Sequence, residues 1–444
     1  MHDQDWKAAG DDLIRHLQTL LRFETVNPPG DERPCIDYIA ETLRSAGYEP
    51  IVLDSAPGRG NVVARRKGTG EKPPLLIYSH VDVVPVEAEK WTHPAFGGEI
   101  ADGCVWGRGA LDMKDMVALE LQTMCMLAES DARLERDVIF AATADEEDGG
   151  HMGAQWLVEN RPELVRAEFG LSEGAGTTEY VGDRAFYGIR TAEKGTSRFR
   201  IRVEGEPGHG SIPRQNTAIH RLAKAVCSLY EHRLPIHLTE TSRGFLTTMA
   251  EMVRVPLEDP ITDEQITAVA QKLPEDVARS LQATVRNTAT PTQLQAGSRI
   301  NVIPGVAEAG VDARLVPGQT PADLEREVRA IVGPETTIEF VDSGNAQEVP
   351  PRDELYRTIE NAVKRHAPDA LVLPVMLSGA TDARWISKLG TRCLGFSPVK
   401  LPPDFPSEGL VHGHDERVPV DGLTWGLRVF YEVVSEFAGA KAQP

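Results

Sequence analysis

The sequence predicts an α/β fold, in which a mainly parallel sheet carries helices on both faces and a smaller α+β domain is inserted into it. Two observations predict this fold. Short apolar, strand-like runs alternate with helix-like segments up to about residue 194 and again after residue 344. Between these stretches, the strand-like runs alternate polar and apolar side chains instead. We therefore predict one domain from residues 1–194 and 344–444, with residues 195–343 inserted as the second.

The first stretch opens with an amphipathic helix, because apolar residues recur at helical spacing from Leu13 to Leu21. The expected elements that follow are a helix over 33–46, strands over 61–66 and 75–79, an apolar helix over 113–128, and strands over 137–143 and 168–171. Ligands of such sheets bind beyond the carboxyl ends of the strands, so polar residues at those ends are the candidates for function.

The inserted segment predicts an antiparallel sheet with two helices on one face. Its expected elements are strands over 197–204, 307–316 and 336–341, and helices over 217–230 and 321–332. The polar segment from about 234 to 297 has a weaker pattern, in which 264–281 is expected to be helical. The first pattern then returns, with a helix over 354–366, strands over 371–375 and 391–396, and a helix over 423–437.

Composition excludes several classes of function. The chain has 444 residues, with 47 Lys and Arg against 67 Asp and Glu, a net charge of −20. So acidic a chain is unsuited to nucleic acid or anionic lipid, which require a basic face. It contains no apolar run of about 18 residues and its start is polar, so we expect neither a membrane span nor a signal peptide. The chain has five cysteines without CxxC spacing, which argues against a disulfide framework and against a cysteine zinc site. We therefore expect a cytoplasmic location.

Metal-ligand residue types recur where the predicted strands end. Alone, each is more often structural: a single His-x-Asp at a strand end or a Glu-Glu pair before a helix is usually not a site. The informative observation is the ordered set: His80, Asp82, Asp112, Glu146, Glu147, Glu173, and His412 or His414 near the C-terminus.

Charge indicates what such a set would need. Five carboxylates in one cleft cannot all ionise without counter-charge, and Arg108 and Lys114 are the nearest basic residues in these segments. Two divalent cations would resolve the repulsion. Two imidazoles with three carboxylates suit zinc (Zn2+), with Co2+ or Mn2+ as alternatives.

Seven motifs, spread over essentially the whole chain, resemble those of the dinuclear zinc peptidase and amidohydrolase family. This family includes aminoacylase-1, acetylornithine deacetylase, succinyl-diaminopimelate desuccinylase, carboxypeptidase S and glutamate carboxypeptidase. The motifs are HVDVVP, GRGALDMKD, ADEEDGG, SEG, GEPGHGSIP, NVIP and VHGHDE, in this order. Two departures are Asp115 and Met116 where the family usually has glycine after Asp-Met-Lys, and His414 two residues beyond His412.

The resemblance implies a role for each site residue. His80 and Glu173 would hold one metal, Glu147 and His412 the other, and Asp112 would bridge them. Asp82 would support His80, and Glu146 would be the general base. The family spacing selects His412 over His414 as the ligand. The family also implies a cis peptide between Asp112 and Met113, and an inserted α+β (ferredoxin-like) domain that serves as lid and dimerisation domain.

The resemblance further implies catalytic and substrate-binding residues elsewhere. His209, in GEPGHGSIP, resembles the family histidine that reaches the active site of the other subunit, which implies a homodimer. SGATDAR resembles the family loop that receives a substrate carboxylate, through Gly379, Thr381 and Arg384. Arg299, Asn301 and Arg314 are further substrate-binding candidates from the inserted domain, although a lone arginine is more often a surface ion-pair partner.

These expectations define the predicted function. It is metal-dependent hydrolysis of an amide or peptide bond in a small substrate with a free carboxylate, either an N-acyl amino acid or a short peptide. The alternatives are a strict dipeptidase, a deacetylase dedicated to one metabolite, or a non-catalytic metal-containing binding protein.

Overall fold

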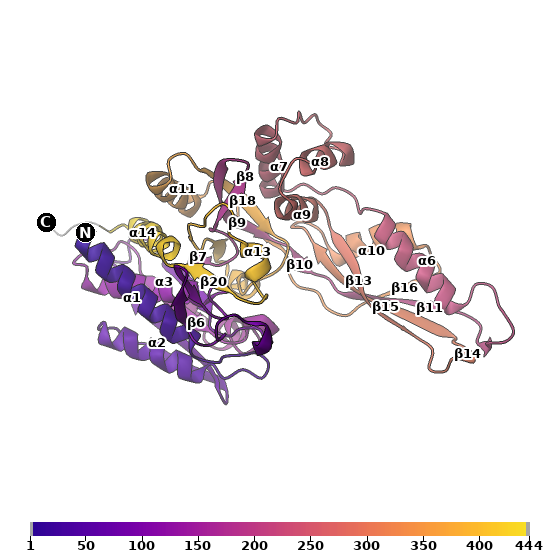
Figure 1. Cartoon of the computed structure of the whole chain (residues 1–444), viewed down its shortest axis with the longest axis horizontal. Helices are drawn as coiled ribbons and strands as arrows, with labels where there is room; N and C mark the ends of the chain where they lie inside the picture. Colours follow the sequence, from indigo (N-terminus) through magenta and orange to yellow (C-terminus); the bar gives the residue numbers. More distant parts are fainter. Residues whose placement is uncertain (1–2, 441–444) are drawn as a thin grey trace. The chain divides into compact units, whose positions relative to one another are not determined.

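The computed structural model describes residues 3–440, which divide into two compact units (Figure 1). Unit 1 contains the described residues up to Thr191, together with Val349–Pro374 and the described residues from Thr381 onward. Unit 2 contains Ala192–Glu348 and Val375–Ala380. Residues 375–380, which the sequence analysis groups with the C-terminal stretch, thus cluster with the inserted segment.

A large sheet forms the centre of unit 1, with the strand order β1-β2-β6-β3-β7-β19-β9 and with β8 and β18 also paired to β9. The central strands β6, β3, β7 and β19 pair in parallel, whereas β1, β2, β8 and β9 pair antiparallel. This confirms the predicted α/β class. The strands are β1 (Ile51–Ala56), β2 (Arg59–Arg66), β3 (Leu75–His80), β6 (Val138–Thr143), β7 (Phe169–Ser172), β8 (Thr178–Val181), β9 (Arg184–Glu193), β18 (Leu371–Leu377) and β19 (Arg392–Gly395).

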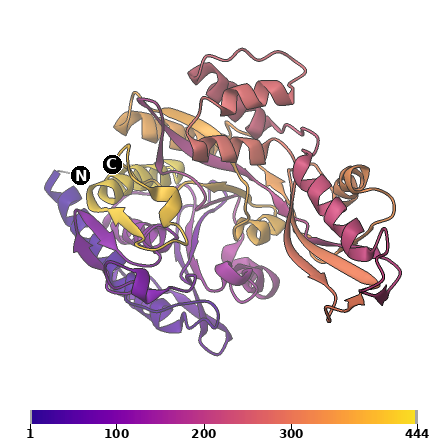
Figure 2. The same ribbon diagram turned by 45° about the vertical axis from the view of Figure 1, so that its right-hand side comes forward.

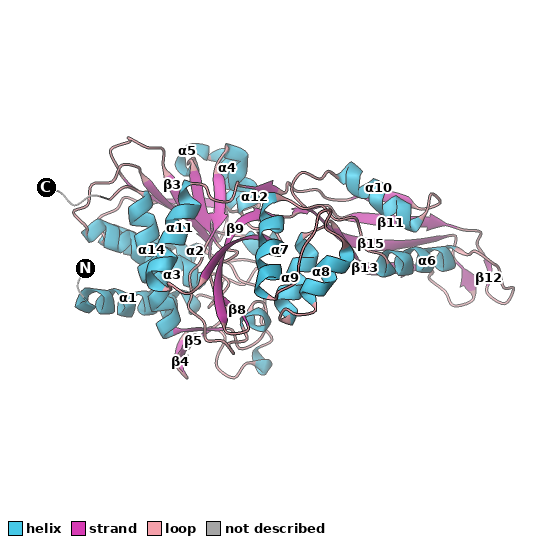
Figure 3. Ribbon diagram, turned by 90° about the horizontal axis from the view of Figure 1, so that it is seen from above, coloured by secondary structure: helices cyan, strands magenta, loops and turns pink. Residues whose placement is uncertain are grey.

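Helices cover both faces of this sheet, as predicted (Figure 3). Alternate residues of a strand point to opposite faces. Leu75 and Ile77 of β3 pack in the main core with α1, α2, α3, α11 and α14, whereas Leu76 and Tyr78 pack with α4 and α12. The helices are α1 (Asp3–Leu21), α2 (Arg33–Ser45), α3 (Lys114–Glu129), α4 (Ala154–Asn160), α5 (Pro162–Val165), α11 (Glu354–His366), α12 (Ala383–Ile386), α13 (Ser407–Leu410) and α14 (Val420–Phe437).

A second, three-stranded sheet of unit 1 has the order β20-β5-β4, from β4 (Glu99–Ala101), β5 (Cys104–Trp106) and β20 (Arg417–Pro419). All its pairs are antiparallel. It joins the segment before Asp112 to the segment after His412, which are far apart in the sequence.

Unit 2 contains an antiparallel sheet of order β10-β15-β11-β16, with β13 also paired to β15. Helices α6 and α10 pack on one of its faces (Figure 2). Phe199, Ile201 and Val203 of β11 are buried against them, while the residues between are more exposed. The elements are β10 (Gly195–Thr196), β11 (Phe199–Glu204), β12 (Gly208–His209), α6 (Ala218–Glu231), β13 (Thr288–Ala296), β14 (Val302–Ile303), β15 (Val306–Leu315), α10 (Pro321–Val332), β16 (Thr337–Phe340) and β17 (Gln347–Glu348).

The segment between α6 and β13 contains α7 (Glu240–Met252), α8 (Asp263–Ala270) and α9 (Glu275–Thr284). The segment 264–281 is helical, as expected, but it is divided between two helices, α8 and α9. Pro274 stands between them as the N-cap residue of α9, and a proline interrupts a helix since it lacks the N–H donor.

Over residues 3–440, we find no helix that is both long enough and apolar enough to cross a membrane. The five cysteines are free, and three of them are buried.

Candidate metal centre

The six residues expected to bind metal or act as base lie in unit 1, at or near the ends of neighbouring elements. His80 ends β3, Glu173 directly follows β7, and Glu146 and Glu147 lie in the turn after β6. These strands are adjacent and parallel, so their carboxyl ends meet at one edge of the sheet. Asp112 precedes α3 and His412 follows α13, and both come from loops.

Five of these side chains form two groups that share Asp112. His80, Asp112 and Glu173 form one group, and Asp112, Glu147 and His412 the other, with the candidate ligand atoms of each group within 4.8 Å of one another. His80 Nε2 lies 3.4 Å from Asp112 Oδ1, and His412 Nε2 lies 3.0 Å from Asp112 Oδ2. The two oxygens of Asp112 therefore face two different imidazoles, which is the geometry of a bridging carboxylate.

The remaining distances also fit metal coordination. His80 Nε2 lies 3.8 Å from Glu173 Oε1, and His412 Nε2 lies 3.2 Å from Glu147 Oε2. Two ligands that each lie about 2.0–2.1 Å from a zinc ion, at tetrahedral angles, are about 3.4 Å apart. His80 Nε2 and Glu147 Oε1 are buried without a hydrogen-bond partner in the described chain. Buried polar atoms are rarely left unpaired, so these residues fit a pair of cations.

Electrostatics indicate an excess of negative charge in the same place. Burial raises the pKa of Glu146 well above its usual range, and Glu173 and Asp382 raise it further. Burial also raises the pKa of Glu173 to about 8, with a further contribution from Asp112. The pKa of His412 is raised to about 10 by its contacts with Asp112 and Glu147. Either bound protons or metal cations must neutralise this cluster.

Asp82 connects His80 to the turn that carries Glu146 and Glu147. Its Oδ1 accepts the backbone N–H of Glu146 at 3.0 Å, and its Oδ2 accepts that of Glu147 at 3.1 Å. Oδ1 also lies 3.5 Å from His80 Nδ1, and the backbone oxygen of Asp82 lies 3.0 Å from the same nitrogen. Asp82 contacts Nδ1 of His80 and can therefore orient the imidazole so that Nε2, the candidate ligand atom, faces Asp112.

Three backbone features shape the loops. The Asp112–Met113 peptide is cis, as the resemblance implies. Asp145, before the glutamate pair, and His412 have left-handed backbone angles, with φ of 74° and 59°. Gly395 of β19 has no room for a side chain, because a Cβ there would lie 1.9 Å from the backbone oxygen of Glu173.

Sequence reasoning missed a buried network behind Asp82. Asn27 Nδ2 donates to Asp82 Oδ2 at 2.8 Å and to Asp145 Oδ1 at 3.1 Å. Arg59 donates from Nη2 to Asp145 at 2.6 Å and from Nε to Glu32 at 2.8 Å. No local motif links these residues. Asp382, which Thr143 Oγ1 contacts at 3.2 Å, was also missed, although it lies inside SGATDAR.

The other predicted site residues are distributed over both units. In unit 1, His414 is exposed and belongs to neither ligand group. Thr381 is buried and its Oγ1 accepts the N–H of Ala383 at 3.1 Å, while the half-buried Arg384 lies 5.6 Å from the Trp385 ring centroid. Gly379 belongs to unit 2, and a Cβ there would meet only ordinary contacts.

His209, Arg299, Asn301 and Arg314 belong to unit 2. The exposed His209 pairs in register with Val302, and Gly210 N donates to Asn301 O at 2.9 Å, so the two motifs share one small hairpin-like element. Arg299 is exposed beside it. Arg314 lies on β15 instead, where its Nε donates to Asp312 at 2.9 Å. Arg314 thus already has an ion-pair partner.

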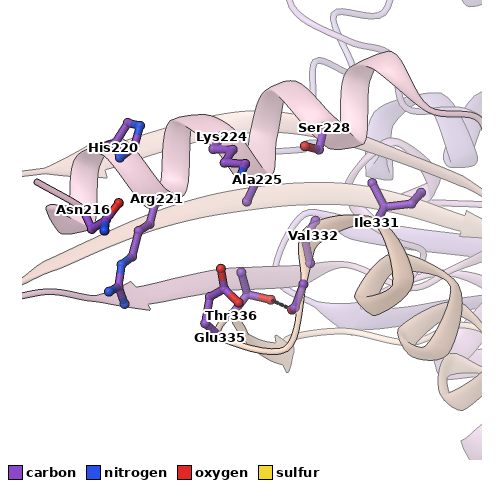
Figure 4. Close-up of a pocket in the computed structure, with 11 residues that line it drawn as sticks. Asn216, His220, Arg221, Lys224, Ala225, Ser228, Ile331, Val332, Glu335 and Thr336 are labelled. Atoms are coloured by element: carbon purple, nitrogen blue, oxygen red, sulfur yellow. Dashed lines mark hydrogen bonds between the residues drawn. The ribbon is translucent and has the colours of Figure 1, made fainter.

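A separate pocket of about 510 Å³ lies in unit 2, between α6 and the end of α10 (Figure 4). His220, Arg221 and Lys224 of α6 line it, together with Glu335 after α10. Its lining contains none of the predicted site residues.

Comparisons with known proteins agree with the resemblance. Residues 76–436 match the model of the peptidase family M20/M25/M40. The chain is 28% identical to aminoacylase-1 of Sus scrofa over 434 residues, which covers 96% of this chain and 95% of that one. It is 29% identical to an N-fatty-acyl-amino acid synthase/hydrolase of Xenopus tropicalis over 441 residues, covering 95% and 85%.

Solved structures share the fold. An M20 family metallo-carboxypeptidase from Sulfolobus solfataricus matches with a TM-score of 0.71 at 19% identity, covering 96% of this chain and 99% of that one. Human carnosine dipeptidase 1 matches with a TM-score of 0.67 at 15% identity, covering 98% of both chains. Because the family model matches most of this chain, the chain belongs to the peptidase family M20/M25/M40. It is a hydrolase of the metallopeptidase and aminoacylase kind.

Proposed function

We propose that this protein hydrolyses an amide bond next to a free carboxylate in a small substrate, either an N-acyl amino acid or a short peptide. His80 and Glu173 would hold one divalent metal ion and Glu147 and His412 a second, with Asp112 between them. Zn2+ is the expected ion, and Co2+ or Mn2+ would substitute. The observation that carries the proposal is that the two oxygens of Asp112 face His80 and His412, at 3.4 and 3.0 Å.

Bound divalent ions would supply Lewis acidity and make water a stronger acid at neutral pH. Glu146 belongs to neither ligand group, yet it lies close enough to Glu173 and His80 to interact with both charges. It can therefore take a proton from the attacking water and return it to the departing amine. Asp82 would keep Glu146 in place through the hydrogen bond to its backbone amide.

His209 would stabilise the developing oxyanion as a hydrogen-bond donor. Its Nδ1 lies 2.7 Å from Ser211 Oγ, so this contact leaves Nε2 for a ligand. We propose that it acts in a homodimer and completes the site of the other subunit. Inactive Glu146→Gln mixed with inactive His209→Ala protein should then regain activity through heterodimers. No recovery, under conditions in which the subunits are shown to exchange, would exclude this role.

Arg384 would receive the substrate carboxylate, with Thr381 as a neutral donor. Gly379, Arg299 and Asn301 are further substrate-binding candidates. The Nε of Arg384 is buried and makes no hydrogen bond in the described chain. Arg384→Ala should raise KM for substrates with a free carboxylate far more than for their amides. Arg314, already paired with Asp312, should have the smaller effect on the same comparison.

The proposal is tested by metal analysis followed by a substrate panel. We expect two divalent ions per chain, complete loss of hydrolysis on chelation, and recovery when Zn2+ or Co2+ is returned. N-acetyl amino acids and dipeptides, followed by release of free amine, then separate an acylase from a strict dipeptidase or a dedicated deacetylase. Bound metal without turnover of any of them would favour a binding protein. We also propose a cytoplasmic location, in keeping with five free cysteines.

A further inference from the structure

We infer that Glu416 is a positioning residue, whose carboxylate joins the loop that carries Asp112 to the loop that carries His412. These two loops lie about 300 residues apart in the sequence, and the second group of candidate ligands needs both. The inference rests on the proposed metal centre. It goes further because it assigns a function to Glu416, which is not a candidate ligand, since both of its carboxylate oxygens already accept hydrogen bonds.

The carboxylate of Glu416 is fully buried and accepts four hydrogen bonds. Oε1 accepts the backbone N–H groups of Leu111 at 2.7 Å and Asp112 at 3.0 Å. Oε2 accepts the backbone N–H of Gly109 at 3.0 Å and Arg108 Nη1 at 2.5 Å. A carboxylate has about four acceptor positions, so this one is saturated. It fixes the main chain up to and including the candidate bridging residue.

Arg108 extends the same contact to the histidine loop. Its Nη2 donates to the backbone oxygen of Gly413, next to His412, at 2.6 Å, and the arginine is almost fully buried. In return, the backbone oxygen of Glu416 accepts Gly107 N at 2.9 Å. The two loops are therefore joined at three points around one buried ion pair.

His412 needs such support more than the other candidate ligands do. Its side chain is 52% exposed, whereas that of His80 is 1% exposed and is enclosed by the sheet. His412 lies in the loop between α13 and β20, where its φ is 59°, so the position of its half-exposed imidazole depends on how that loop is held. A shift of the loop by about 1 Å would break the shared geometry, because metal ligands must stay within a few tenths of an ångström of their ideal distances.

The informative variant is Glu416→Gln, which keeps the size of the side chain. A glutamine presents NH2 in place of one oxygen, so one pair of donors would face another donor whichever way the amide turns. We expect the affinity for the weaker of two metal ions to fall by about 10- to 100-fold, the usual effect of losing a residue behind the ligands. Arg108→Lys should have a smaller effect in the same direction, because lysine cannot reach both partners through one planar group.

The readouts are calorimetric titration of metal-free protein with Zn2+ and the visible absorption of bound Co2+, which reports ligand geometry without turnover. The matched control is Glu327→Gln in unit 2, a glutamate whose side chain is 9% exposed and accepts from His237 Nε2 and Asn287 Nδ2. We expect the control to lower the melting temperature and leave metal affinity and the Co2+ spectrum unchanged.

Wild-type affinity and an unchanged Co2+ spectrum in Glu416→Gln would overturn the inference, as would an equal loss of affinity in Glu327→Gln. If Glu416→Gln fails to fold, the same criteria apply to Arg108→Lys. Absence of metal binding by the wild-type protein would instead reject the proposed metal centre, so the two failures are distinguishable.

Discussion

The carboxylate of Asp82 accepts the backbone N–H of Glu147 at 3.1 Å, so the residue that contacts His80 also fixes the position of a candidate ligand in the turn after β6. Asp82 is fully buried, and its contacts with His80 and the amides hold its pKa below the usual range, although burial acts in the opposite direction. The two ligand groups are therefore coupled through a residue that belongs to neither.

Asp82→Asn should weaken metal binding. The amide NH2 of the asparagine would face a backbone N–H group that a carboxylate oxygen accepts in the wild-type protein, so the turn that carries Glu147 would shift. We expect about a 10- to 100-fold loss of affinity for Zn2+, measured by calorimetry, together with a fall in kcat. Asp137→Asn is the matched control, since Asp137 also accepts a backbone N–H, from Gly68 at 2.8 Å, and lies outside both ligand groups. Equal affinity in the two variants would contradict the role given to Asp82.

Arg59→Lys should destabilise unit 1, because lysine cannot keep both contacts of the guanidinium, to Glu32 at 2.8 Å and Asp145 at 2.6 Å. The three side chains are 12%, 0% and 5% exposed, and breaking a buried pair typically costs about 3–5 kcal/mol. Chemical denaturation would measure this cost. Arg33→Lys, at an exposed ion pair with Asp54, should cost less than about 1 kcal/mol. A loss as small at Arg59 would show that the network contributes little.

Gly395→Ala should displace Glu173. The added Cβ would lie 1.9 Å from the backbone oxygen of Glu173 and 2.4 Å from Arg190 Nε, so the main chain must move. We expect the melting temperature to fall, by the equivalent of about 1–3 kcal/mol, and metal affinity to fall at least tenfold. Gly409→Ala, where a Cβ would meet nothing within 4 Å, should alter neither. Normal metal binding by Gly395→Ala would mean that β19 does not constrain Glu173.

Lys194 should make the stability of unit 2 depend on pH. Burial lowers the pKa of Lys194 to about 7, and its Nζ donates to Ala283 O, Arg286 O and Thr288 Oγ1. Between about pH 7 and the unfolded pKa near 10.4, the unfolded chain binds a proton that the folded chain does not, so stability should rise with pH, by up to about 1.4 kcal/mol per unit.

Lys194→Met should therefore show a flatter dependence of melting temperature on pH between 7 and 10, whatever its absolute stability. Lys224→Met, at an exposed position of α6, should keep the wild-type slope. A wild-type slope in Lys194→Met as well would rule out this lysine as its origin.

Much of the fold was predictable because the burial of its strands produces recognisable hydrophobic patterns in the sequence. β3 and β6 are buried on both faces and read as continuous apolar runs, and β11 is buried on one face and alternates. The ends of the helices are also indicated by residues close by in the sequence. Thr262 and Gln265 form a capping box at the start of α8, and with Pro274 they could have revealed that 264–281 holds two helices.

The candidate ligands were predictable for a different reason: each follows a recognisable motif, and parallel strands bring their ends together. The residues that hold them in place were not. Arg59 and Asp145 are 86 residues apart, and Glu416 contacts Asp112 over 304 residues. Such contacts leave no periodicity and no spacing in the sequence, because they depend only on how distant loops meet after folding.

The long separation between His80 and His412 has a consequence for biosynthesis. A ribosome makes the chain from its N-terminus, so His80, Asp112, Glu147 and Glu173 all emerge well before the last candidate ligand does. A nascent chain can offer at most one of the two ligand groups until residue 412 has been translated. Uptake of a second ion at the proposed centre would therefore have to wait for the synthesis of His412.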